Sequence, residues 1–256
     1  MFRQLFRLLL PCLFFISCKE EKKEKIREAP LSFKKESIIK RAGKNCDTAE
    51  YDCSIISLEV LKATGAAGVS EEINEALEEH VIRMIAAEEN PDISSLEELS
   101  EGFLADYREA AESFSEEPPW EAYVNESIYL RAESVVSIGI TTEIFSGGAH
   151  GYKTLSFLNI NPETGEVFSP EDLFNPEFKA FVEEKFRRQQ EIPAEENINS
   201  TGFWFKNDSF QLPENIGFSE DKVILIYNSY EIAPYAAGDI YLEIPMEEAR
   251  PFLKIE

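Results

Sequence analysis

The sequence predicts an α+β fold, an antiparallel sheet meander with helices packed on it, and two observations indicate this class. Residues 70–114 carry apolar side chains at helical spacing, three or four residues apart. From Trp120 onward the apolar period changes to two, in successive segments rich in Val, Ile, Tyr, Phe and Thr. Helices and strands are therefore grouped rather than alternating, which is typical of α+β domains. A chain of 256 residues, 43% of them apolar, is long enough for one large domain or two small ones.

The N-terminus resembles a bacterial lipoprotein signal. Residues 1–17 combine Arg3 and Arg7 with an apolar run that is too short to cross a bilayer. The run ends at Ser17, immediately before Cys18, as in a lipobox, so Cys18 is the predicted lipidated residue. We expect an exported, lipid-anchored protein of the cell envelope, placed at the outer membrane because Lys-Glu-Glu-Lys after Cys18 resembles a surface-export signal of Bacteroidetes lipoproteins. An ordinary signal peptide with an incidental cysteine is the alternative.

Charge is divided unevenly along the chain. Residues 19–45 hold ten basic and five acidic side chains with few apolar ones, so residues 18–45 are predicted to be a charged tether that contributes no core. Residues 46–256 hold 13 basic and 44 acidic side chains. Such an acidic body excludes a nucleic-acid partner, because Lys and Arg must neutralise the phosphates, and it attracts cationic partners. The alternative is that the excess Glu only keeps the body soluble.

Two cysteines remain after Cys12 leaves with the signal and Cys18 takes the lipid. Cys46 and Cys53 are separated by six residues, and disulfides persist in exported proteins, so they are predicted to form one. Two thiols without a nearby His or further Cys cannot complete a tetrahedral metal site. No nucleotide-binding glycine pattern is present either. We therefore predict no metal and no cofactor.

The N-terminal domain is predicted to span residues 46–161. Its first strand, residues 54–61, places alternate apolar side chains on one face. Two helices follow, residues 70–87 and 94–114, each beginning at a serine cap, and the second has a capping box from Ser94 to Glu97. Two prolines end the helical stretch, and the strands of the meander come next, at about 120–131, 133–145 and 152–160.

The C-terminal domain is predicted to span residues 162–256. A Pro-Glu-Thr-Gly turn at 162–165 leads into a short helix capped by Ser169, with Pro170 in its first turn. A longer helix covers about 176–190. Further strands are predicted, in order, at residues 203–205, 210–212, 223–227 and 240–244.

His150 is the strongest single candidate for function. The segment Ser146-Gly-Gly-Ala-His-Gly151 interrupts two strands with three glycines, which permit unusual backbone conformations and present an imidazole at a loop. The alternative is that the imidazole only fixes this loop by hydrogen bonds. His80 lies on the apolar stripe of its helix, so we expect a packing role. No catalytic residue is predicted, because Ser146 lacks the Gly-x-Ser-x-Gly context and the abundance of acidic residues makes any carboxylate pair uninformative.

Three stretches together resemble a known pair of domains. They are Ser146–Gly151, Leu158–Phe174 and Tyr230–Gly238, the last followed by Ile244-Pro245. In combination they resemble tandem bacterial domains of unknown function, found in the extracytoplasmic part of lysozyme-sensing anti-sigma factors and in front of some peptidoglycan deacetylase domains. The resemblance covers about residues 50–256. It implies an α+β body, an actin-like or chaperone-ATPase-like subdomain in the second half, and a binding role at the cell wall.

These 256 residues contain neither an anti-sigma segment nor a deacetylase domain with its metal-binding Asp and His, so neither activity is expected. We expect a non-catalytic envelope lipoprotein that binds peptidoglycan or a cationic wall-active protein such as lysozyme. A structural or assembly lipoprotein and a wall-glycan-modifying enzyme are the alternatives. The candidate binding residues are Gly147, Gly148, His150, Tyr152, Tyr230 and Tyr235.

Overall fold

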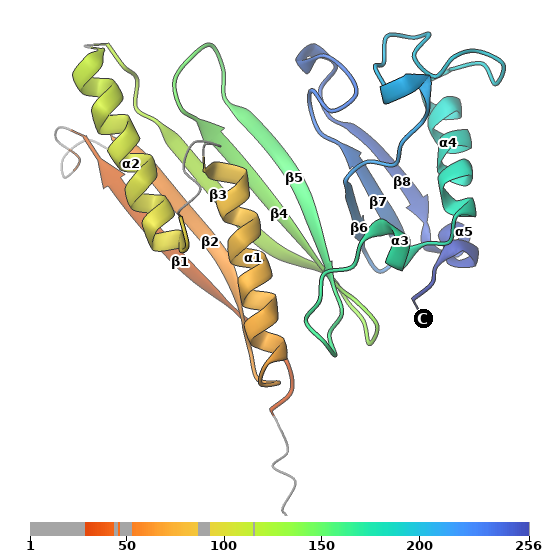
Figure 1. The fold of residues 1–256 in the computed structure, drawn as a ribbon, viewed down its shortest axis with the longest axis horizontal. Helices are drawn as coiled ribbons and strands as arrows, with labels where there is room; N and C mark the ends of the chain where they lie inside the picture. Colours follow the sequence, from red (N-terminus) through yellow and green to blue (C-terminus); the bar gives the residue numbers. More distant parts are fainter. Residues whose placement is uncertain (1–28, 44–45, 47–52, 87–92, 115, 256) are drawn as a thin grey trace, which may run out of the picture.

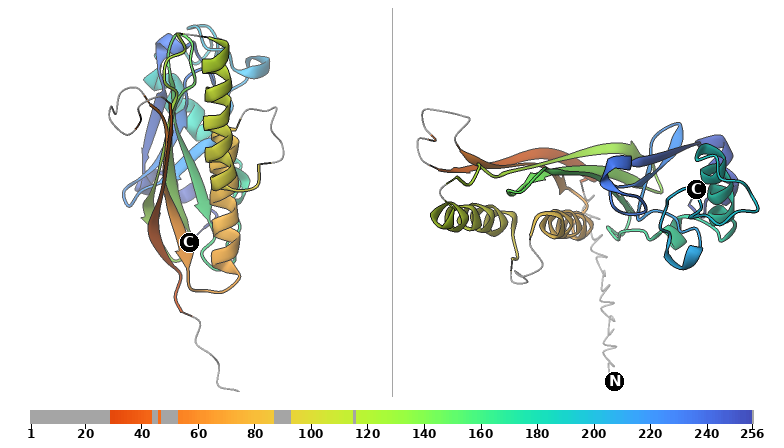
Figure 2. Two further views of the ribbon diagram at one scale, coloured as in Figure 1. Left: turned by 90° about the vertical axis from the view of Figure 1, so that its left-hand side faces the viewer. Right: turned by 90° about the horizontal axis from the view of Figure 1, so that it is seen from above.

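The computed structural model describes residues 29–43, 46, 53–86, 93–114 and 116–255, and its fold confirms the predicted α+β class. A five-stranded sheet in the order β1-β2-β3-β4-β5 lies beside a three-stranded sheet in the order β6-β7-β8 (Figure 1). Helices α1 and α2 cover one face of the large sheet, and α4 covers one face of the small sheet (Figure 2). The signal at residues 1–17 and the lipidation of Cys18 lie outside the described residues and stay predictions.

The large sheet contains the predicted meander. Strands β3 (Glu121–Arg131), β4 (Val136–Phe145) and β5 (Tyr152–Ile160) pair antiparallel in sequence order. Strand β2 (Ser54–Thr64) pairs with β3 in parallel. This parallel pair is possible because the connection from β2 to β3 is a long crossover, which parallel neighbours require. The crossover contains α1 (Val69–Ile85) and α2 (Leu96–Ser113). The sheet is thus antiparallel except at this pair.

The tether predicted at residues 18–45 is wrong for its second half. Strand β1 (Ser32–Ala42) pairs antiparallel with β2 over its whole length, from Ser32 opposite Thr64 to Ala42 opposite Ser54. This segment is charged and poor in apolar residues, like a tether, because β1 is an edge strand with mostly exposed side chains. Charged residues on an edge strand also discourage pairing with other chains. Leu31, Phe33 and Ile38 nevertheless pack against the core.

The predicted disulfide between Cys46 and Cys53 is confirmed. The two Cα atoms lie 5.3 Å apart, and Cys53 directly precedes the first residue of β2. The bond therefore closes the connection between β1 and β2.

The first core lies between the large sheet and the two helices. The inner face of β2 contributes Ile56, Leu58 and Val60, as the alternation predicts. The helical spacing of apolar residues likewise places one face of α1 and one face of α2 in this core. The buried side chains of the two helices include Ile73, Leu77, Val81, Leu99, Phe103 and Tyr107.

Helix α2 begins one residue later than predicted. The Ser95 hydroxyl accepts a hydrogen bond from the Glu98 backbone N–H at 3.2 Å and is the N-cap. Ser94 instead donates its own backbone N–H and hydroxyl to the Glu98 carboxylate, each at 2.9 Å. The predicted capping box is therefore not formed: Ser95 caps the helix, and the Glu98 carboxylate bonds Ser94 instead of the N-cap backbone.

The second core lies between α4 (Glu177–Gln189) and the small sheet, formed by β6 (Asn215–Phe218), β7 (Lys222–Tyr227) and β8 (Ile240–Pro245). After Lys222, strand β7 has no charged side chain because both of its faces are covered. Val223, Leu225 and Tyr227 share a cluster with the α4 side chains, whereas Ile224 and Ile226 pack with Phe157 of β5. The remaining short elements are α3 (Pro170–Leu173), α5 (Met246–Ala249) and 3-10 turns at Lys206–Asp208, Tyr235–Ala237 and Arg250–Phe252.

The strands predicted at 203–205 and 210–212 are wrong. Phe205 is held by a side chain instead of a strand partner, because Asn199 accepts from its backbone N–H at 2.7 Å and donates to its carbonyl at 2.9 Å. Phe205 and Phe210 are buried in the second core without any strand. Strand β6 was missed, since four residues containing a glycine give a weak alternation.

Polar contacts join the two sheets at β5. The Asn228 side chain bonds both backbone groups of Leu155, accepting at 3.1 Å and donating at 3.2 Å, much as a neighbouring strand would. Asn159 Nδ2 donates to the Ile216 carbonyl at 2.6 Å. Gly217 lies against the Phe157 ring, where any Cβ would overlap it. The two cores thus lie on either side of residue 161, while β5 contacts both sheets.

Candidate functional site

The predicted binding residues come from two connections at one end of the molecule. The hairpin loop between β4 and β5 carries His150 and leads into Tyr152, and the connection from β7 to β8 carries Tyr230 and Tyr235. Both connections lie at the upper end of the molecule in Figure 1. The fold therefore brings together segments about 80 residues apart in the sequence.

Three of these rings form a row, which we call the aromatic row: His150, Tyr235 and Tyr230. The His150 ring stacks on Tyr235 with ring centres 4.1 Å apart and planes at 17°. Tyr235 lies 5.5 Å from Tyr230, with planes at 32°. Tyr230 and Tyr235 are 53% and 40% exposed, and His150 is exposed as well. The row is therefore a surface feature made of rings that support one another.

Hydrogen bonds hold two rings of the row to the backbone of the loop between β4 and β5. Nδ1 of His150 lies 2.9 Å from the Gly151 carbonyl, and because a carbonyl can only accept, Nδ1 is the donor. The Tyr235 hydroxyl donates to the same carbonyl at 3.4 Å. The Tyr152 hydroxyl donates to the Ser229 carbonyl at 3.3 Å, so it ties β5 to the neighbouring connection instead of joining the row.

The two predicted glycines have different roles. Gly147 has φ of 86°, and a Cβ there would lie 2.7 Å from Oε1 of Glu117, which accepts a hydrogen bond from the Trp120 indole at 2.7 Å. Gly148 has φ of 83° but open space around it. Gly147 is needed for close approach and for conformation, Gly148 for conformation alone.

Two carboxylates order the connection from β7 to β8. Asp239 accepts from the backbone N–H and hydroxyl of Ser229 at 2.9 and 2.8 Å. Glu231 accepts from the Asn228 backbone N–H at 3.0 Å, and burial raises its pKa to about 7. Burial also raises the pKa of Tyr152, with Asp239 and Glu231 adding to the shift. The aromatic row therefore has an acidic surrounding.

A groove of about 610 Å³, which we call the junction groove, runs between α1, β5 and the connection from β7 to β8. His80 lines it, with Nε2 2.7 Å from the Ser156 hydroxyl oxygen, and burial lowers the His80 pKa to about 4. Thr154 also lines it, with 4% exposure and a hydroxyl that has no partner in the described chain. The groove thus offers uncharged hydrogen-bonding groups beside Tyr230, together with the charged side chains of Arg83, Glu214 and Glu231.

His80 is half-buried, as predicted, but it has a polar partner that the sequence did not reveal. Ser156 is 76 positions away, so no local motif joins the two. A histidine beside a serine hydroxyl is one requirement for nucleophilic catalysis. The Ser156 hydroxyl, however, donates to the Ile140 carbonyl at 3.4 Å, so its proton is not directed at His80. The pair supports the fold and the groove wall, and no catalytic role is evident.

No membrane-spanning helix is found in the described part of the chain, where every helix is too short or too polar. Nor do His, Cys, Asp and Glu side chains gather in threes to hold a metal ion within that part.

Comparisons with known proteins point to a family without an assigned function. A family model described as "Protein of unknown function (DUF3298)" matches residues 167–247. A solved structure of a member of the DUF3298 family from Bacteroides fragilis is 19% identical with a TM-score of 0.64, covering 87% of this chain and 93% of that one. A DUF3298 family protein from Pseudomonas aeruginosa is 21% identical with a TM-score of 0.63, covering 88% and 95%. A search of curated protein sequences finds no match.

These findings confirm the resemblance to a domain of unknown function for residues 167–247, which include Tyr230 and Tyr235. They also confirm the fold over most of the chain.

Proposed function

We propose that this protein is a non-catalytic, lipid-anchored lipoprotein of the cell envelope that binds a cationic wall-active protein, such as lysozyme, at the aromatic row. The observation that carries the proposal is the row itself: three exposed rings from two connections, in which His150 stacks on Tyr235, both bond the Gly151 carbonyl, and Tyr230 contacts Tyr235. Stacked rings lose little conformational freedom on binding, and tyrosines are enriched among the residues that dominate interface energies.

Charge and resemblance support a cationic protein as the partner. Residues 46–256 hold 13 basic and 44 acidic side chains, so encounter with a basic protein is accelerated. The stretches that carry His150, Tyr230 and Tyr235 are also those that resemble lysozyme-sensing ectodomains. Long-range attraction brings the partner, and the aromatic row supplies the close contacts.

The test is a calorimetric titration of hen lysozyme into the mature chain carrying Cys18→Ser, at about 0.15 M salt, where the Debye length is about 8 Å. Saturable binding is expected to persist there. Tyr235→Ala should weaken it at least roughly tenfold, because a central interface aromatic contributes above 1.4 kcal/mol. Phe114→Ala, an exposed aromatic at the end of α2, is the matched control and should bind normally.

Absence of saturable binding, or equal weakening by Tyr235→Ala and Phe114→Ala, would overturn the proposal and favour a structural or assembly role.

The junction groove favours a second candidate, binding of wall glycan. Its uncharged His80 and the partnerless Thr154 hydroxyl suit sugar hydroxyls, and Tyr230 offers an apolar face. Sedimentation with purified peptidoglycan that is lost in Thr154→Val, but retained in Tyr235→Ala, would identify this function instead.

A further inference from the structure

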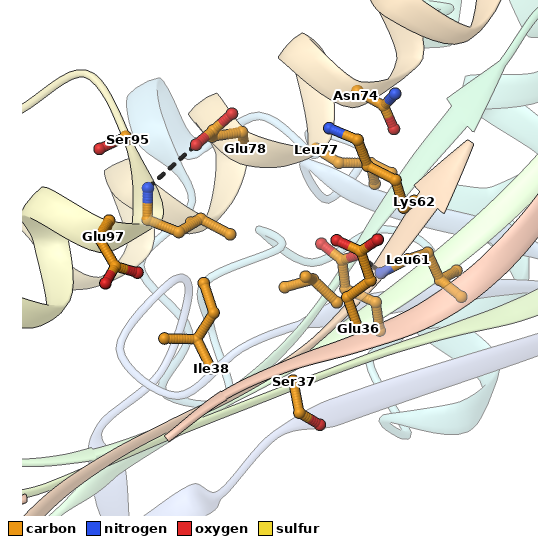
Figure 3. A pocket seen from close by; sticks show the side chains of 13 residues that line it. Glu36, Ser37, Ile38, Leu61, Lys62, Asn74, Leu77, Glu78, Ser95 and Glu97 are labelled. Atoms are coloured by element: carbon orange, nitrogen blue, oxygen red, sulfur yellow. Dashed lines mark hydrogen bonds between the residues drawn. The ribbon is translucent and has the colours of Figure 1, made fainter. Parts of the chain in front are cut away.

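A second pocket, unrelated to the aromatic row, lies between β1 and the two helices of the first core. We call it the acidic pocket. Its volume is about 270 Å³, and four glutamates line it beside one lysine, Lys62. Glu36 and Ile38 point from β1 toward the helices, whereas Ser37 points away, as the strand alternation requires (Figure 3). The glutamates are Glu36, Glu78, Glu97 and Glu126.

Glu126 is the unusual member of this set. It lies on the inner face of β3, at the same phase as the buried Ala122 and Val124, and it is fully buried. One carboxylate oxygen, Oε2, accepts from the Leu61 backbone N–H at 2.6 Å. The other, Oε1, is buried with no hydrogen-bond partner in the described chain. A buried carboxylate with half of its bonding capacity unused is costly, so a ligand that supplies a donor would be strongly favoured.

Two of the other glutamates are already engaged. Glu78 accepts from the Leu96 backbone N–H at 3.0 Å, at the start of α2 (Figure 3). Glu97 pairs with Lys40 at 2.7 Å. Glu36 has no ion pair or hydrogen bond with any described residue, so Glu36 and Glu126 are the two carboxylates left for a ligand.

A small organic cation suits this arrangement better than a metal ion. The described residues hold no group of three or more His, Cys, Asp or Glu able to ligate a metal, whereas an ammonium group needs only acceptors. The aliphatic side chains of Ile38, Leu77 and Leu96 line the same pocket and can cover a short alkyl chain. At roughly 30 Å³ per water-sized group, the volume admits several non-hydrogen atoms.

We propose that the acidic pocket binds a short alkylammonium ion, with the ammonium donating to Glu126 Oε1 and paired in charge with Glu36. Attraction between these charges is strong because the carboxylate is removed from water. The site shares no residue with the aromatic row, so its test succeeds or fails independently of lysozyme binding.

Proton release should accompany binding. Burial raises the pKa of Glu126 to about 7, an effect that the Leu61 N–H and the Lys35 charge oppose. An ammonium beside it favours the ionised form, so affinity should increase from pH 5 to pH 8. The other charged groups around the pocket are Glu36 of β1, Lys62 of β2, Glu78 of α1 and Glu97 of α2.

The experiment is a calorimetric titration of 1,4-diaminobutane into the mature chain carrying Cys18→Ser, with tetramethylammonium as a cation without N–H donors. Saturable binding of the diamine, and at least roughly tenfold weaker binding of tetramethylammonium, is expected because the latter cannot donate. Glu126→Gln should weaken diamine binding at least tenfold. Glu59→Gln, which changes an exposed glutamate on the opposite side of the neighbouring strand, should not.

Glu36→Gln provides a second variant at an exposed position, useful if Glu126→Gln unfolds the chain, and it should weaken binding severalfold. The proposal is overturned if the diamine does not saturate, if tetramethylammonium binds equally well, or if Glu36→Gln and Glu59→Gln are indistinguishable.

Discussion

The two sheets of the molecule bury different kinds of side chain. The core between the large sheet and helices α1 and α2 is mainly aliphatic, and nearly all of it comes from regular strands and helices. The core between the small sheet and α4 is rich in phenylalanine, and part of it comes from residues 203–210, which form no strand. The comparison shows two ways to bury a surface: by the periodicity of regular elements, or by rings that interlock around an irregular segment.

Phe186 is the centre of the second arrangement. Its ring lies between 5.1 and 5.7 Å from four others, those of Phe203, Phe205, Phe210 and Tyr227. Three of these partners belong to the irregular segment, so Phe186 helps to order that segment, together with the Asn199 side chain that bonds the Phe205 backbone.

Phe186→Ala should therefore have the largest effect, a loss of about 4 kcal/mol of unfolding free energy. Leu99→Ala, at a fully buried aliphatic position of the first core, should cost about 3 kcal/mol. Urea denaturation gives both values, and amide exchange locates the damage. If Phe186→Ala leaves the protection of the Phe205 backbone amide unchanged, the irregular segment is not held in the way described.

Glu126→Gln should alter the pH dependence of the first region. The native pKa of about 7 exceeds the ordinary 4.5, so the contribution of Glu126 to stability is complete below pH 4.5 and is lost as pH rises through 7. The glutamine side chain of the variant does not titrate between pH 4 and pH 8. Its stability relative to the native protein should rise by roughly 3 kcal/mol between pH 4 and pH 8.

Urea denaturation at several pH values measures this change, with Glu59→Gln as the exposed control. Parallel pH profiles for Glu126→Gln and the native chain would mean that the carboxyl is not buried as described.

Replacing Cys46 and Cys53 by Ser should cost about 2 kcal/mol, because the disulfide restrains a short loop in the unfolded chain. The loss should be confined to the first region. Thermal unfolding of the double variant checks the magnitude, and alkylation of the unreduced native protein checks the bond. Two free thiols in natively exported protein would contradict it.

Asn228→Ala should have the smallest effect on stability, about 1 kcal/mol, since it removes two hydrogen bonds between the regions. This variant tests whether the two regions of the molecule unfold together. If the regions unfold as one unit, the variant should shift a single transition, seen identically by circular dichroism and by Trp fluorescence. Separate transitions already present in the native protein would show that the two cores are independent.

The sequence predicted the fold best where one face of an element is buried. The alternation of Ile56, Leu58 and Val60 placed β2 correctly. The apolar alternation did not reveal β1, because its edge position leaves most side chains exposed. It also predicted a strand at residues 203–205 where none exists, because Asn199 takes the place of a strand partner there.

The candidate site was predictable in part. Loop glycines and the family resemblance pointed to His150 and Tyr235, which the fold brings into contact. The contact between His80 and Ser156 depends on tertiary structure and leaves no local signal. Glu126 did leave one: a carboxyl at an inward position of an alternating strand, in phase with Ala122 and Val124.

The parallel pairing of β2 with β3 determines how the large sheet can assemble. Strands β1 and β2 form a hairpin closed by a disulfide, and β3, β4 and β5 form a meander with short connections, so each unit needs only local contacts. The β2–β3 pair instead closes the long crossover that contains both helices. Loop-closure entropy makes such a contact slower than the local ones. We therefore expect the late event in the folding of this region to be the docking of a finished hairpin onto a finished meander, with α1 and α2 enclosed by the same step.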